Sequence, residues 1–293
     1  VYHDMASLFG FEKQAIAFPY RCPLQGKHDH RACLRTFAQR LSAFFFGEHL
    51  TRKTLFRYGT GFDEVTPART VYPGNYIVNY AGLKYIIPFG HLRLRMSGPT
   101  AGRLIAAEIH ARFTSVNLPH LHQRTNEAGL GGAFRPGVEL DVENEQETTI
   151  ELSNEFERQF FGDLMLFTTE ALLREVNVNK PFERNVVMQI MERKEQELLT
   201  LYQQKHHAIM EKNRQFDELV FKTGHWWLDT PDLDNTLQKV RAFIDNIDCN
   251  FGVQSPAWLK IRSAAHRAER KQQILQALMR YRIGRDAWDR LFD

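Results

Sequence analysis

The sequence has little cysteine, no long apolar run and no recognisable leader. Cys22, Cys33 and Cys249 cannot all pair with one another, which excludes a disulfide scaffold and favours a reducing compartment such as the cytoplasm. No stretch reaches the roughly 18 apolar residues that a membrane-spanning helix needs. The opening VYHDMASLFGFEK lacks a basic region followed by an apolar one, so no signal peptide is expected. The sequence therefore predicts no membrane contact.

Two motifs that carry chemistry are also missing. No Gly-x-Ser-x-Gly sequence is present, so a serine hydrolase with a nucleophile elbow is not predicted. The glycines at 129–132 are not followed by Lys-Ser or Lys-Thr, so they do not form a phosphate-binding loop. What is present is a globular composition of 293 residues, 43% of them hydrophobic, in which 22 Phe can supply a sizeable core.

Charge is unevenly distributed along the chain, although the formal net charge is only +3. Residues 125–170 hold 11 acidic and 2 basic side chains, whereas residues 1–124 carry a clear basic excess. Such asymmetry indicates contacts with charged partners or with other copies of the chain. Pairing of the two regions inside one fold is an equally good explanation.

The N-terminal half is predicted to combine one helix with antiparallel strands. Apolar residues over 31–46 recur at helical spacing. The stretch YIVNYAGLKYIIPFGHLRLRM is rich in Tyr and Ile and is interrupted by Gly and Pro, which predicts strands near 76–80, 84–87 and 91–96. Residues 103–116 follow the turn-like SGPTAG and are assigned to a further strand, so that the strands form a meander.

The C-terminal half is predicted to be helical. The longest helix has apolar residues near heptad spacing and should pack against partners as a bundle or hairpin. Thr230-Pro231 and Ser255-Pro256 each place a capping hydroxyl before a first-turn proline, which marks two further helix starts. The predicted fold class is α+β, with an α+β domain over 1–178 and a helical domain over 179–293. The expected helices lie at 153–176, 182–223, 231–247 and 256–282.

Four residues near the N-terminus are candidate metal ligands. Zinc binds Cys and His tetrahedrally in structural sites, and CPLQGKHDHRAC offers four such side chains within twelve residues. The spacing matches no established zinc motif, and Cys33 also occupies an apolar position of the helix that follows. A polar loop with a buried Cys at the helix start is therefore the alternative. The candidate ligands are Cys22, His28, His30 and Cys33.

The loop NLPHLHQRTNEAGLGG, residues 117–132, is a second candidate site. His120 and His122 are two residues apart, so they would face the same side of an extended strand and could bind the zinc of a hydrolase. Neither a carboxylate nor a Cys follows at a clear ligand spacing. The alternative is that the two histidines fix the loop through hydrogen bonds to its backbone.

The order of these elements resembles the ubiquitin-conjugating-enzyme fold and its RWD-like relatives over residues 30–180. In bacterial and phage relatives of this fold, a His-Pro-His-like signature precedes a Cys-Leu-Gly. The present chain is similar in order: a helix, a strand meander, PHLH (119–122), Gly-Leu-Gly (129–131) and a second helix. Gly129 occupies the position of the thioester-forming cysteine. Thioester transfer needs a thiolate. The resemblance therefore implies a binding domain without conjugating activity, and a phage or mobile-element origin.

The C-terminal helix is a candidate contact for nucleic acid or a partner. Residues 256–293 hold 9 basic and 4 acidic side chains with aromatic residues between them, and such a helix can lie along phosphates. The alternative is a solvated face on a helix whose apolar side belongs to the core. The candidate cations are Lys260, Arg267, Arg270, Lys271, Arg280, Arg282 and Arg285.

Trp226 and Trp227 lie in an expected helix–helix turn and would anchor an interface if exposed. Taken together, these features favour a non-enzymatic structural or adaptor subunit of a larger assembly, in contact with other protein subunits as a homo- or hetero-oligomer. Nucleic-acid binding through the basic N-terminal region and C-terminal helix is the first alternative. A zinc-dependent hydrolase at His120 and His122 is the second, and no cofactor other than zinc is expected.

Overall fold

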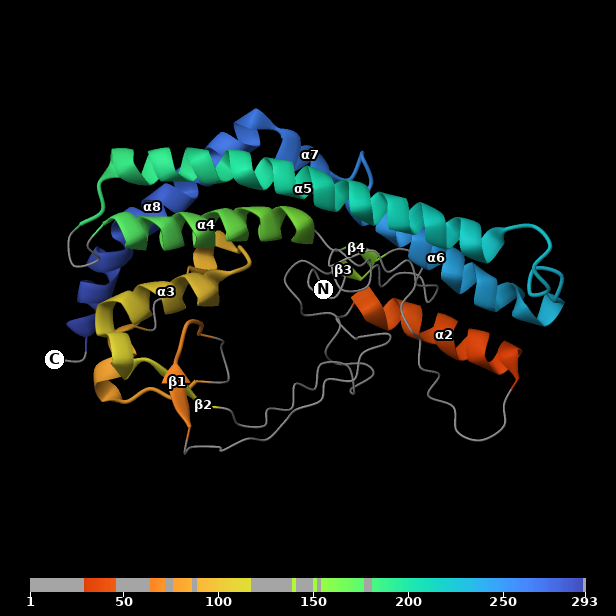
Figure 1. The fold of residues 1–293 in the computed structure, drawn as a ribbon, viewed down its shortest axis with the longest axis horizontal. Coiled ribbons are helices and arrows are strands. Elements are labelled where there is room, and N and C mark those ends of the chain that lie inside the picture. The colour runs from red at the N-terminus through yellow and green to blue at the C-terminus, as the bar shows by residue number, and fades with distance from the viewer. Residues whose placement is uncertain are drawn as a thin grey trace. The chain divides into compact units, whose positions relative to one another are not determined.

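The described part of the chain is mainly helical, with two short antiparallel sheets (Figure 1). The computed structural model describes residues 29–45, 64–71, 76–85, 89–116, 139–140, 150–151, 154–176 and 181–291. The α-helices are α2 (His30–Phe45), α3 (Ser97–Ile109), α4 (Glu155–Glu175), α5 (Arg184–Phe221), α6 (Asp234–Phe251), α7 (Pro256–Arg262) and α8 (Ala264–Asp289). Shorter 3-10 helices are η2 (Tyr80–Tyr85), η3 (Gly90–Leu92), η4 (His110–Arg112) and η6 (Pro231–Leu233).

The two sheets each consist of two strands. In the first, β1 (Val65–Pro67) pairs with β2 (Thr114–Val116) in the register Val65 with Val116. In the second, β3 (Glu139–Leu140) pairs with β4 (Ile150–Glu151). The expected α+β class is therefore correct in its coarse form, but helices dominate.

The chain divides into two compact units, each built from segments far apart in the sequence. The α6 unit contains α2, β3, β4, α6 and the part of α5 from Gln203 onward. The α8 unit contains β1, β2, α3, most of α4, the part of α5 up to Tyr202, α8 and the 3-10 helices η2, η3 and η4. This division does not coincide with the domain boundary expected near residue 178, which stays a prediction.

Aromatic and polar contacts hold α2, α5 and α6 together in the α6 unit. The Phe216 ring of α5 makes edge contacts with Phe37 of α2 and with Phe243 of α6, at centroid distances of 6.3 and 6.1 Å. On the buried side of α5, Asn213 donates a hydrogen bond to the Ile244 carbonyl (3.1 Å). Since Asn213 faces Ile244 and Phe216 faces Phe243, α5 and α6 run antiparallel as the expected hairpin.

In the α8 unit, α4 and α5 form a second antiparallel hairpin. The Tyr202 hydroxyl of α5 donates to the buried Asp163 carboxylate of α4 (2.6 Å), and Gln159 donates to the other oxygen of the same carboxylate (2.7 Å). At the other end of the hairpin, Arg193 pairs with Glu175 (2.8 Å). The largest fully buried side chains of this unit come from this hairpin and from α3: Leu104, Phe160, Phe161, Leu164, Met165 and Tyr202.

Two glycines inside helices allow other backbone segments to approach closely. A Cβ added at Gly102 of α3 would lie 2.5 Å from the Arg69 carbonyl oxygen. A Cβ added at Gly162 of α4 would lie 2.7 Å from the Arg95 carbonyl carbon and closer still to its oxygen. Ordinary Cβ atoms almost never come within 3.0 Å of another atom. Gly162 therefore lets the turn after η3 lie directly on α4.

The strand meander predicted for the N-terminal half is wrong where the structure describes it. Residues 76–79 form no regular element, residues 84–85 belong to η2, and the expected strand at 91–96 is occupied by the end of η3 and a turn. Of 103–116, only Thr114–Val116 is a strand, because 97–109 form α3. Residues 86–87 lie outside the described part.

The helix predictions are largely confirmed. The helices expected at 31–46, 153–176 and 182–223 correspond to α2, α4 and α5. Ser255 caps α7, since its Oγ accepts a hydrogen bond from the Trp258 amide (3.3 Å). The helix expected over 256–282 is interrupted, because Ser263 accepts from the His266 amide (3.3 Å) and thereby begins α8 as a separate helix.

Candidate functional site

Three buried carboxylates fix α8 to the rest of its unit. Glu108 comes from α3, Glu157 from α4 and Glu195 from α5, and their side chains are only 4%, 1% and 6% exposed. Removing a carboxylate from water is costly unless cations compensate its charge. All three carboxylates pair with cations of α8, so the position of this helix is specified by charge as well as by apolar packing.

Glu157 sits at the most buried of these sites. Its Oε1 lies 2.8 Å from both His266 Nε2 and Arg270 Nε. Arg270 also donates through Nη1 to the Leu92 carbonyl (3.4 Å) and to Gln273 (3.0 Å). Arg270 therefore joins α4, α8 and the η3 turn.

Glu195 and Glu108 bind the neighbouring cations. Glu195 receives Arg267 Nε at 2.8 Å and Lys271 Nζ at 2.5 Å, one on each carboxylate oxygen. Arg285 pairs with only one oxygen of Glu108, Oε2, and the other oxygen, Oε1, is buried without a hydrogen-bond partner among the described residues. Burial raises the pKa of the nearby Tyr281 hydroxyl, and the negative charge of Glu108 raises it further.

These ion pairs bear directly on the cations expected to contact nucleic acid or a partner. Four of these cations have side chains that are only 16–20% exposed, and each forms an ion pair with a buried carboxylate: Arg267, Arg270, Lys271 and Arg285. Lys260 and Arg282 are half-buried, and Arg280 is exposed. Nucleic-acid binding stays a prediction, and binding through the four paired cations would first require their ion pairs to break.

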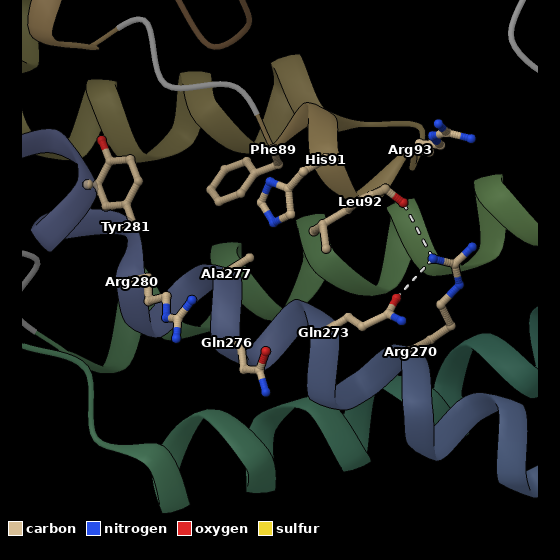
Figure 2. A pocket seen from close by; sticks show the side chains of 11 residues that line it. Phe89, His91, Leu92, Arg93, Arg270, Gln273, Gln276, Ala277, Arg280 and Tyr281 are labelled. Carbon is tan, nitrogen blue, oxygen red and sulfur yellow. Dashed lines mark hydrogen bonds between the residues drawn. The ribbon is translucent and has the colours of Figure 1, made fainter. Parts of the chain in front are cut away.

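A pocket of about 530 Å³ lies between η3 and α8 within the α8 unit. Figure 2 shows the η3 segment along one side and α8 along the other, with side chains from both between them. The residues of α8 recur at spacings of three and four, which places them on one helix face. Ala277 and Gly284 belong to this face and leave room for the pocket. Its α8 side chains are Arg270, Gln273, Gln276, Ala277, Arg280, Tyr281 and Gly284.

The pocket is lined by cations and by two buried aromatic rings. Phe89 and Tyr281 stack at a centroid distance of 6.2 Å and close one end. Arg93, Arg270 and Arg280 contribute guanidinium groups, and neither Asp nor Glu is among the described lining residues. Glu157 compensates the charge of Arg270 from behind, whereas Arg93 and Arg280 form no ion pair with any residue that the structure describes. Figure 2 draws these two side chains at opposite ends of the pocket, with the Arg93 guanidinium directed away from α8.

Several contacts hold the backbone of Arg93 in place. Arg93 has the left-handed conformation (φ 52°), which is uncommon for a residue with a Cβ. Its carbonyl accepts a hydrogen bond from Arg158 Nε (2.6 Å), and the Arg95 amide donates to the Arg158 carbonyl (3.2 Å). With Gly162 beneath it, this turn is fixed on α4 from both sides. The Arg93 side chain thus starts from a rigid backbone position.

A second feature of the α8 unit is an exposed apolar surface. The Trp288 indole donates to the Leu83 carbonyl (3.0 Å), and Lys84 pairs with Asp289 (3.2 Å), so the end of α8 lies beside η2. We call the large exposed apolar side chains of η2, of the end of α8 and of the residues next to each of them the terminal apolar surface. Its residues are Ile77, Tyr80, Trp288 and Leu291, of which Ile77 is 93% and Leu291 72% exposed.

The two tryptophans expected at an interface differ in their surroundings. Trp227 is half-buried, stacks on His225 at 4.1 Å and donates to the Val220 carbonyl (2.8 Å), so it closes the turn between α5 and α6. Trp226 is exposed. Only Trp226 is thus available to a partner.

The expected metal and loop sites fall mostly outside the described residues. His30 is exposed at the start of α2 and Cys33 is half-buried one turn later, but Cys22 and His28 are not described. His120, His122 and Gly129 also lie outside the described ranges. Within those ranges, no group of three or more His, Cys, Asp or Glu side chains is placed to hold a metal ion. Both zinc sites stay predictions.

Comparisons with known proteins do not assign the chain to a family. Neither a family model, nor a curated protein, nor a solved structure matches it significantly. The described residues also give no support to the ubiquitin-conjugating resemblance, because the meander is absent from them and PHLH and Gly-Leu-Gly lie elsewhere. No described helix is long and apolar enough to cross a membrane.

The sequence indicated only part of the pocket. Arg270 and Arg280 were among the expected contact residues, but the assignment of 91–96 to a strand hid the turn that carries Arg93. A partial signal was present on α8, where the small or polar residues at 273, 277, 280 and 284 share a stripe beside the apolar one formed by 274, 278 and 281. The remaining lining residues that sequence reasoning missed are Phe89, His91, Leu92, Gln276 and Tyr281.

Proposed function

We propose that this protein is a non-enzymatic subunit of a larger assembly and that the terminal apolar surface is where it meets another subunit. The carrying observation is the exposure of large apolar side chains from two segments that lie beside each other. Contiguous apolar surfaces on soluble proteins commonly mark interaction sites. Tryptophan is enriched among the residues that contribute most to binding, and the Trp288 N–H is already satisfied by Leu83, so its exposed part is apolar.

The partner proposed is a second copy of the chain. Two copies can bury the same apolar surface against each other through a twofold axis, which is the commonest symmetry of soluble oligomers. The uneven charge supports this choice, because the acidic segment 125–170 of one copy complements the basic excess of the other.

The mass of the purified protein in solution tests the proposal. Light scattering after size exclusion should give a multiple of the 34.2 kDa chain, and the mass should rise with protein concentration. Ile77→Asp and Leu291→Asp should each return the protein to the monomer, because a charge buried in an apolar contact is costly. Val253→Asp is the matched control, since Val253 is also exposed (59%) but belongs to the turn after α6.

Two results would overturn the proposal. One is a monomer at all concentrations up to about 100 μM, well above the dissociation constants of stable oligomers. The other is an oligomer that Val253→Asp dissociates as readily as Leu291→Asp, because the contact would then lie elsewhere.

A further inference from the structure

We propose that two copies of the chain pack their α8 helices antiparallel and cross at Gly284, so that Leu291 of each copy enters the pocket of the other. This inference rests on the proposed assembly through the terminal apolar surface and assigns how the two copies are arranged there. It starts from Ala277, Gly284 and Leu291, which recur at intervals of seven and therefore share one helix face. Leu291 directly follows α8, and its amide donates to the Trp288 carbonyl (3.1 Å), so the helical turn continues up to it.

The residues of this face are arranged symmetrically about Gly284. Arg280 and Trp288 lie four residues before and after Gly284. Ala277 and Leu291 lie seven residues before and after it. In a twofold antiparallel pair, a residue before the crossing point faces the residue that lies equally far beyond it in the second copy. Arg280 of one copy therefore meets Trp288 of the other, and Ala277 meets Leu291.

The contact between Ala277 and Leu291 places a large exposed side chain opposite a hollow. Leu291 is largely exposed, whereas Ala277 offers only a methyl group in the wall of the 530 Å³ pocket. Figure 2 shows this methyl group pointing from α8 toward the η3 segment, where Phe89 and Leu92 supply further apolar lining. A leucine that enters the pocket buries apolar surface on both copies, and the twofold axis provides two such contacts in each dimer.

The contact between Arg280 and Trp288 pairs a cation with an indole ring. Arg280 is exposed and forms no ion pair with any residue in the described part of the chain. The Trp288 N–H already donates to the Leu83 carbonyl, so the exposed part of the indole is apolar. Guanidinium groups stack favourably on indole rings. This contact therefore accommodates the charge of Arg280 inside the interface without a carboxylate.

Gly284 lets the two helices approach closely at the crossing point. It is exposed, and a Cβ added there meets no atom of its own chain within 4 Å. Packed helix axes lie about 8–10 Å apart and Cα atoms lie about 2.3 Å from their axis, which leaves roughly 3–5 Å between the two Gly284 Cα atoms. This separation is within the range that a disulfide bridges.

Disulfide cross-linking under mild oxidation, followed by non-reducing gel electrophoresis, tests the crossing point. Gly284→Cys should form a covalent dimer, because its two thiols meet at the twofold axis. Ala287→Cys is the matched control, since Ala287 is also small and exposed. The two Ala287 positions lie about 9 Å apart along the crossed helices, which is too far for a disulfide. The wild type, which keeps its three native cysteines, measures the background.

Two further variants test the contacts on either side of the crossing. Ala277→Leu fills the pocket from its own chain and should weaken dimerisation by about tenfold or more in sedimentation equilibrium, because Leu291 of the other copy loses its burial. Arg280→Gln should weaken dimerisation by about two- to fivefold, the usual effect of an exposed cation–π contact. Arg174→Gln removes an exposed charge at the end of α4 and should leave dimerisation unchanged.

The outcomes separate the antiparallel crossing from the assembly itself. A protein that stays monomeric overturns both proposals. A dimer that Leu291→Asp dissociates, but in which Gly284→Cys cross-links no more than Ala287→Cys, overturns only the crossing. A folded Ala277→Leu variant that dimerises as tightly as the wild type also overturns it, because Leu291 then lies outside the pocket. Circular dichroism checks the fold of this variant, and cross-linking alone decides if it does not fold.

Discussion

Replacing Gly162 by alanine should destabilise the protein, although the same change normally stabilises a helix. Alanine favours the interior of a helix over glycine by about 1 kcal/mol. At Gly162, however, the new methyl group would lie 2.7 Å from the Arg95 carbonyl carbon. The turn that carries Arg93 and Arg95 would have to move away from α4 by roughly half an ångström or more to reach ordinary contact distance.

The cost of this movement can be worked out from the contacts that it disturbs. The hydrogen bonds from the Arg95 amide to the Arg158 carbonyl (3.2 Å) and from Arg158 Nε to the Arg93 carbonyl (2.6 Å) both cross the gap. Each is worth about 1 kcal/mol, and overpacking of this kind costs about 1–3 kcal/mol. After subtraction of the helix gain of about 1 kcal/mol, Gly162→Ala should lower the free energy of unfolding by about 2–4 kcal/mol.

Gly284→Ala is the matched control, because it is the same substitution inside α8 with nothing within 4 Å of the added Cβ. It should raise the free energy of unfolding by about 0.5–1 kcal/mol. Urea denaturation followed by circular dichroism measures both changes. Equal stability of the two variants, or a stabilised Gly162→Ala, would refute the close approach of the turn to α4.

Two further predictions concern the buried charges and the buried phenol of the α8 unit. Glu157→Gln should lower the free energy of unfolding by about 3 kcal/mol, because it leaves Arg270 uncompensated. Glu175→Gln, the control, breaks the exposed pair with Arg193 and should cost less than about 1 kcal/mol. Equal losses of stability in urea denaturation would contradict this prediction. Burial raises the pKa of Tyr281 above its ordinary value of 10. The neutral phenol therefore stabilises the fold below pH 10. This contribution to stability falls as the pH rises further, because only the unfolded chain then releases the phenol proton. In a titration of tyrosinate absorbance through roughly pH 9–11, folded wild type and Tyr281→Phe should therefore rise by the same amount, and a rise smaller by one tyrosine in the variant would show that Tyr281 ionises normally.

Periodicity identified the long helices because their apolar residues lie on one side. In α5, the apolar heptad positions from Val187 to Ile209 are buried as the pattern predicted, whereas Phe216 and Val220 near the end of the helix are half-buried. The starts at Pro231 and Pro256 were also visible, since each proline occupies a first turn. Of the two expected capping hydroxyls, however, Ser255 accepts a capping hydrogen bond, whereas Thr230 donates to the Trp226 carbonyl instead. These features are local, so the sequence alone is enough to predict them.

The N-terminal strands were predicted wrongly because local composition competes there with tertiary contacts. The sequence SGPTAG was interpreted as a turn, yet Pro99 occupies the first turn of α3, where a missing N–H costs nothing. Gly102 is then required by the backbone of Arg69 rather than by a turn. No property of 97–109 alone distinguishes a glycine that breaks a helix from one that admits a neighbouring chain.

The sequence alone also did not show which cations of α8 form buried ion pairs. The spacing of each cation from the buried apolar residues of the helix divides them into two groups. Arg267, Lys271 and Arg285 share heptad spacing with Ile274, Leu278 and Tyr281, which are buried, so these three cations extend the core face of the helix and need buried carboxylates. Arg280 belongs to the neighbouring stripe with Gln273, Ala277 and Gly284, where no large apolar side chain fills the space. The composition of 256–293 treats all nine cations as equal. The residues at three and four positions from a cation therefore separate Arg267, Lys271 and Arg285, which buried carboxylates hold inside the unit, from Arg280, which belongs to the small and polar stripe.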